Sequence, residues 1–181
     1  MRLAPVPIRF GSLLFDQLPE LVGYCVASSL PTHASPQCLS ACAYFGIVLA
    51  GLMEGLGRNE VFSGSWGPLV ELKQLRTLHP EILEIIEGGF REKMPPDIVG
   101  SGYVVKSLEA ALWAFYDARD FREAVLRAVN LGDDADTTGA VCGQLAGAHW
   151  GESGIPAEWR RGLVRAEMVE SALGMLLESE Q

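Results

Sequence analysis

A short acidic turn carries the residues of this chain that are best suited to chemistry. Residues 133–138 read Asp-Asp-Ala-Asp-Thr-Thr and stand directly before the small, apolar run 139–148. In a turn that opens a helix, Asp134 and Asp136 can point to the same side, while the Thr137 hydroxyl lies at the helix start. Such oxygen donors suit Mg²⁺ or Mn²⁺, which favour oxygen and retain water. The sequence therefore predicts a hard-cation site with Asp134, Asp136 and Thr137 as ligands.

The simplest alternative for the turn is a helix N-cap. Asp and Thr at a helix start accept hydrogen bonds from free backbone N–H groups and complement the helix dipole. One aspartate suffices for that, whereas three carboxylates within residues 133–136 repel one another at neutral pH unless a positive group lies between them. The cation site is the favoured interpretation, and the cap stays open.

Two other acidic motifs fit the turn less well. An EF-hand beginning at Asp134 would place Leu145 at position twelve, where calcium requires a bidentate glutamate. The Asp-x-Asp nucleophile of haloacid-dehalogenase-type phosphatases follows a buried strand, but Asp134-Ala135-Asp136 follows the end of an expected helix. The calcium loop is excluded, and the aspartyl nucleophile is disfavoured.

The elements that must position the turn are all expected to be helices. Helical periodicity and boundary signals predict helices within 11–29 with a break near Pro19, from 36 to about 56, up to 78, from 80, over 104–116, from 121 to about 130, over 136–149, and finally up to 177. Residues 88–103, rich in glycine and proline, are expected to form a loop. No convincing strand-like alternation or internal repeat is visible, so an all-α fold is predicted.

Length and charge limit the size of the protein and its partners. The 181 residues suit one domain spanning 1–181, and the 49% hydrophobic content argues against extended disorder. A net charge of −9 leaves no basic stripe for phosphate backbones. A nucleic-acid partner is therefore not expected, although a small anion could bind through local donors.

The cysteines and the apolar segments bear on the compartment. Cys25, Cys38, Cys42 and Cys142 show no Cys-x-x-Cys pairing, and a metal shared by Cys38 and Cys42 would have no further ligand nearby in the sequence. The run 38–53 falls short of the ~20 residues of a bilayer crossing, so we expect a buried central helix and no membrane partner. The first residues lack the apolar core of a signal peptide. A reduced, cytoplasmic protein is the expectation.

Several segments, taken in their order along the chain, also resemble a known family. They are Arg127–Thr137, Gly143–Ala148, Gly151 and Ile155–Trp159, with support from Gly100–Val105, Ser107–Trp113, Leu30–Ser35 and Met1–Pro5. In order and spacing, they resemble the C-terminal signature of the ADP-ribosylglycohydrolase family, which includes the dinitrogenase-reductase-activating glycohydrolase. The resemblance covers essentially the whole chain.

The resemblance implies a compact orthogonal helical bundle, truncated at the N-terminus. Family members have about three hundred residues, and their N-terminal third supplies a Thr-Asp-Asp metal motif, an acidic catalytic residue and a Gly-rich loop that grips the diphosphate. The chain is expected to begin after these parts and to be the C-terminal two-thirds of one domain. Asp134, Asp136 and Thr137 then match half of a two-metal centre, and no catalytic residue is assigned.

The resemblance also implies a substrate and a cofactor. His33 and the loop residues Gly100, Ser101, Gly102 and Tyr103 are expected to contact ADP-ribose, with Mg²⁺ or Mn²⁺ as the metal. The implied activity is hydrolysis of the glycosidic bond between ADP-ribose and a modified protein acceptor, impaired where the N-terminal metal motif is missing. The alternative is an inactive family member that binds ADP-ribose or serves in assembly, as a homo-oligomer that covers exposed apolar faces.

Overall fold

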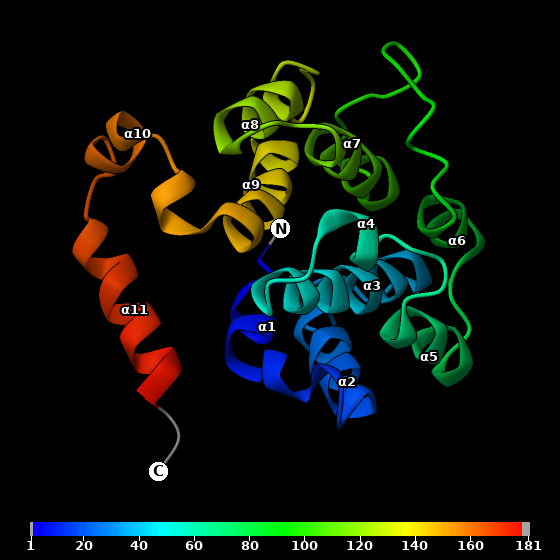
Figure 1. The fold of residues 1–181 in the computed structure, drawn as a ribbon. Helices are drawn as coiled ribbons and strands as arrows, with labels where there is room; N and C mark the ends of the chain where they lie inside the picture. The colour runs from blue at the N-terminus through cyan, green and yellow to red at the C-terminus, as the bar shows by residue number, and fades with distance from the viewer. Residues whose placement is uncertain (1, 179–181) are drawn as a thin grey trace.

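The computed structural model describes residues 2–178 and, within that range, contains helices and no β-strand, which confirms the all-α prediction (Figure 1). The helices, in chain order, are α1 (Pro5–Phe10), the 3-10 turn η1 (Gly11–Leu14), α2 (Leu18–Ser29), α3 (Pro36–Met53), α4 (Arg58–Val61), α5 (Gly67–Leu75), α6 (Pro80–Ile86), α7 (Val104–Tyr116), α8 (Phe121–Val129), α9 (Ala135–Gly154), α10 (Ala157–Arg161) and α11 (Ala166–Glu178).

Helix α3 is the centre of the core. Ser35 caps it by accepting a hydrogen bond from the Cys38 N–H at 3.2 Å, and Pro36 stands in its first turn. Helices α1, α2, α5, α6, α7 and α9 pack around it (Figure 1). By length and composition α3 could cross a membrane, but 67% of that stretch is buried inside the fold. It is therefore packed as the core helix of the bundle.

The helix pair α8 and α9 holds the acidic turn between its ends. The two helices pack closely, and a Cβ on Gly139 would lie only 2.7 Å from Val129 Cγ1. Helix α7 packs against both, with Leu112 and Phe115 fully buried. The turn is thus carried by a rigid three-helix layer beside α3.

The structure differs from the sequence prediction at the start of the chain. Pro5 and Pro7 do not prevent a helix, because they stand in the first turn of α1, where backbone N–H groups have no helical partner. Helix α9 was predicted to end at His149, and its regular part does end close to that residue, because Gly151, with φ +67°, interrupts the helical backbone before a last turn to Gly154. The C-terminal α11 stands away from the bundle, and α1 is its main neighbour (Figure 1).

Candidate functional site

The acidic turn joins α8 to α9 through two consecutive residues with left-handed backbone. Gly132 has φ +76° and Asp133 has φ +51°. Glycine adopts this conformation freely, and aspartate tolerates it better than most residues. The reversal brings Asp134 to the N-cap position of α9, so Asp136 and Thr137 fall in the first helical turn.

The Asp134 carboxylate does not cap its own helix. Its backbone carbonyl accepts the first helical hydrogen bond, from the Thr138 N–H at 3.0 Å, and also the Thr138 hydroxyl at 3.0 Å. No side-chain cap bond from Asp134 occurs among the described residues. The N-cap alternative therefore does not explain this carboxylate, which lines a cavity instead.

The cavity has a volume of about 510 Å³ and is lined from several distant segments. Of the residues singled out from the sequence, His33, Gly102, Asp134 and Thr137 line it. The others, Gly100, Ser101, Tyr103 and Asp136, are not among its lining residues but stand within two residues of Gly102 or Thr137 in the chain. The fold thus brings together four residues from three segments that lie far apart in the sequence.

The glycines of the loop before α7 lie against the acidic turn. A Cβ on Gly100 would come within 2.6 Å of the Gly132 carbonyl oxygen, which no real Cβ tolerates. A Cβ on Gly102 would lie 3.3 Å from Asp134 Oδ2. Glycine is therefore required at residue 100 for close backbone approach, and Gly102 leaves the Asp134 carboxylate room at the cavity wall.

The Tyr103 hydroxyl is already bonded to another helix. The hydroxyl donates to Glu81 Oε2 on α6 at 2.6 Å, and this bond raises the pKa of Tyr103. The Ser101 hydroxyl accepts the Tyr103 N–H at 3.2 Å, which shapes the entry into α7. The contact of Ser101 and Tyr103 with a ligand stays a prediction, and here both residues stabilise the loop.

A polar part of the cavity wall comes from the end of α2 and the residues that follow it. The Ser29 hydroxyl donates to the His33 carbonyl at 2.6 Å, and the His33 N–H donates to the Ser29 carbonyl at 2.8 Å, so the backbone that carries His33 is fixed. Arg2 donates to the Thr32 hydroxyl at 3.1 Å and is the cation among the lining residues. Sequence reasoning did not single out Arg2, because its place beside residue 32 is a tertiary contact.

The rest of the wall is mainly apolar and includes two thiols. Phe45, Leu108 and Val141 supply the apolar surface, and Cys38 and Cys42 lie on the same side of α3. Burial raises the pKa of the Cys42 thiol, which disfavours the thiolate that a metal would need. Within residues 2–178 no group of three or more His, Cys, Asp or Glu side chains is placed to hold a metal ion.

That result limits the metal site predicted at the turn. Asp134 and Thr137 share the cavity wall, and Asp136 stands in the same helical turn without lining the cavity. These oxygen donors fit a hard cation chemically, but they form only part of a coordination shell. The residues present therefore fit Mg²⁺ or Mn²⁺ as a partial site, in which water or further ligands complete the shell.

Comparison with known proteins identifies the family to which the chain is similar. Residues 1–181 match the family model described as ADP-ribosylglycohydrolase. ADP-ribosylarginine hydrolase Tri1 of Serratia proteamaculans (strain 568) is 38% identical over 145 residues, which make up 80% of this chain and 37% of that protein. ADP-ribosyl-[dinitrogen reductase] glycohydrolase of Rhodospirillum rubrum is 30% identical over 77% of this chain and 42% of its own length.

A second Tri1, from Pseudomonas putida (strain GB-1), is 37% identical over 74% of this chain and 34% of its own length. A solved structure titled "ADP-ribosylglycohydrolase-related protein complex" superposes with a TM-score of 0.76 at 35% identity, over 97% of this chain and 60% of that chain. The chain thus spans well under half the length of these three curated relatives.

Proposed function

Because this chain belongs to the ADP-ribosylglycohydrolase family, we propose that it binds ADP-ribose in the cavity beside the acidic turn and takes part in Mg²⁺-dependent hydrolysis of an ADP-ribosyl bond. The observation that carries the proposal is the convergence of His33, Gly102, Asp134 and Thr137 on one cavity. Its volume of about 510 Å³ lies within the range of ~300–1,000 Å³ common for small-molecule sites.

Each wall of the cavity suits a different part of the ligand. The apolar side with Phe45, Leu108 and Val141 offers a surface for a base, and Arg2 offers a positive charge for a phosphate. Asp134 and Thr137 would hold the Mg²⁺ ion, with Asp136 in the same helical turn as a further carboxylate. When bound, that ion would polarise ribose hydroxyls and water at the bond to be cleaved.

The acceptor and the partners belong to the same proposal. Two of the relatives are called ADP-ribosylarginine hydrolases, so an ADP-ribosylated protein with a modified arginine is the first substrate to test. We place the reaction in the cytoplasm, where the four cysteines, free in the described structure, would stay reduced.

Isothermal titration with MgCl₂ and with ADP-ribose tests the binding step. We expect Asp134→Asn to weaken Mg²⁺ binding and to weaken Mg²⁺-dependent ADP-ribose binding by about tenfold, since the carboxylate loses its charge at the cavity wall. Asp16→Asn is the matched control, because Asp16 is an exposed aspartate outside the cavity. If the wild-type chain binds neither compound, the proposal fails.

The second candidate is an inactive family member that binds ADP-ribose or serves in assembly. It is favoured by α11, where Met168, Val169 and Leu173 are exposed and no side chain is buried. A second copy of the chain would cover this apolar surface. Binding of ADP-ribose without release of ADP-ribose from a modified arginine peptide would favour this candidate over the hydrolase.

Light scattering measures the assembly part of that candidate. The mass of the wild type should rise with concentration, and Leu173→Glu should stay monomeric. Val70→Glu, a control with an exposed valine on α5, should associate as the wild type does. A monomer at all concentrations would remove the assembly role.

A further inference from the structure

The segment 87–103, between α6 and α7, must be held in place for the cavity to keep its shape. It is the longest stretch without a helix in the described residues, and its end carries Gly100 and Gly102 against the acidic turn. A segment of this length without secondary structure is ordinarily mobile unless side chains fix it. The contacts that fix it therefore bear directly on the site.

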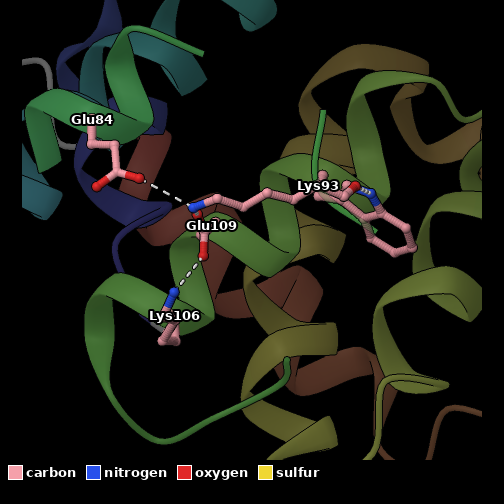
Figure 2. A network of polar contacts seen from close by, with 5 residues as sticks. Glu84, Lys93, Lys106 and Glu109 are labelled. Carbon is pink, nitrogen blue, oxygen red and sulfur yellow. Dashed lines mark hydrogen bonds and ion pairs between the residues drawn. The ribbon is translucent and has the colours of Figure 1, made fainter. Parts of the chain in front are cut away.

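Lys93 ties the middle of the segment to two helices (Figure 2). Its Nζ lies 2.5 Å from Glu109 Oε1 on α7 and 3.2 Å from Glu84 Oε1 on α6. Its backbone carbonyl accepts the Trp113 indole N–H at 2.9 Å, so the residue is held at its side chain and at its backbone. The bond to Glu109 raises the pKa of Lys93, which keeps the ammonium charged.

Glu109 is the buried end of this arrangement. Its side chain is 4% exposed and lies between Lys93 and Lys106, whose Nζ is 2.9 Å from Glu109 Oε2. A buried carboxylate is costly unless it is paired and hydrogen-bonded, and here each of its two oxygens has a lysine as its ionic partner. The pairing therefore gives the segment a fixed position that a flexible loop of this composition would not have.

From Lys93, contacts continue both to α8 and to the turn that precedes Gly100. Trp113, which holds the Lys93 carbonyl, has the Arg127 guanidinium of α8 4.5 Å from its ring centre. On the other side, the Met94 carbonyl accepts the N–H groups of Asp97 at 2.8 Å and Ile98 at 3.3 Å, and Ile98 is buried. Lys93 thus connects the turn before Gly100 to the helix layer that carries Asp134.

We propose that Lys93 and Glu109 are positioning residues for the candidate site. Their ion pair fixes the segment so that Gly100 and Gly102 stay against Gly132 and Asp134, and the Asp134 carboxylate stays at the cavity wall. Neither residue is among those that line the cavity. The effect on ligand binding rests on the proposed function, whereas the effect on the segment does not.

Three variants separate positioning from stability. Lys93→Met breaks the pair and leaves Glu109 with Lys106 alone. Lys93→Met combined with Glu109→Gln also removes the buried charge, so thermal stability should return toward wild type. Lys106→Met is the matched control, because it also removes one partner of Glu109 but leaves the segment bound through Lys93.

Hydrogen exchange measured by mass spectrometry on peptides covering 97–102 is the readout that needs no ligand. We expect exchange about tenfold faster in Lys93→Met and in the double variant, and wild-type exchange in Lys106→Met. Lys93→Arg should restore slow exchange. Wild-type exchange in both Lys93→Met and the double variant would overturn the proposal.

Titration with ADP-ribose in the presence of MgCl₂ is the second readout. Affinity should fall about tenfold in the double variant even where its stability has recovered, which a purely structural role would not produce. Full affinity there would overturn the link to the site. If the wild type binds no ADP-ribose, the proposed function fails, and the exchange result alone decides whether Lys93 positions the segment.

Discussion

Glycine 100 shows how a single missing side chain shapes the site. Because a Cβ at this residue would lie 2.6 Å from the Gly132 carbonyl oxygen, we expect Gly100→Ala to push the loop and the acidic turn apart. Overpacking of this kind costs about 1–3 kcal/mol of unfolding free energy. Urea denaturation measures this loss of unfolding free energy, and titration with ADP-ribose measures the accompanying loss of affinity.

Gly64→Ala is the control for that substitution, since nothing lies within 4 Å of a Cβ at residue 64. We expect it to change the unfolding free energy by less than about 0.5 kcal/mol. Equal effects of the two substitutions would contradict the close approach of the loop to the turn.

His149 makes the stability of the bundle depend on pH. Its ring packs edge-to-face against Phe115 and Trp150, and burial, with a smaller effect of Arg58, lowers its pKa. A lowered pKa means that the unfolded chain binds the proton more readily. The contribution is therefore complete above the unfolded pKa of about 6.5 and is lost as the pH falls through that value toward the folded pKa.

We expect the melting temperature of the wild type, measured relative to that of His149→Gln, to be lower at pH 5 than at pH 7.5. Differential scanning calorimetry at both pH values gives this difference and cancels the titration of other groups. His33→Gln serves as the comparison, because His33 is exposed. A difference that is the same at both pH values would refute the assignment to His149.

At the scale of the element, the start of α8 is stabilised by a side-chain cap. Asp120 Oδ1 accepts the Glu123 N–H at 2.7 Å. Glu123 binds Arg119 through the backbone N–H and the guanidinium instead of closing a full capping box. We expect Asp120→Ala to cost about 1 kcal/mol in urea denaturation and Asp120→Asn to cost little.

The boundaries of other helices were less predictable. The helix over 104–116 was located correctly, because its apolar spacing and the loop before it are both local signals. Helix α1 was missed, since prolines at residues 5 and 7 read as breakers until their position in the first turn is known. The regular part of α9 ends near the predicted His149, because Gly151 takes a non-helical backbone conformation, and a further helical turn follows to Gly154.

At the scale of the whole molecule, α10 and α11 are peripheral. None of their residues is buried in the described structure, and α11 touches mainly α1. We expect a chain that ends at Gly162, measured at a concentration where it is monomeric, to melt within about 3 °C of the full chain. Leu112→Ala, at a fully buried position, should lower the melting temperature far more. A comparable loss in both would show that α11 belongs to the core.

The sequence alone determined the fold class, the family resemblance and the acidic turn, because helical periodicity, turn residues and the clustering of carboxylates are local properties of the chain. The tertiary structure decided which residues share a cavity. Arg2 contacts Thr32, and Gly100 lies against Gly132, only because the chain packs around α3 and α7. It also paired Lys93 of the long loop with the buried carboxylate of Glu109, since this pairing depends on where α7 lies and not on the spacing of residues 93 and 109.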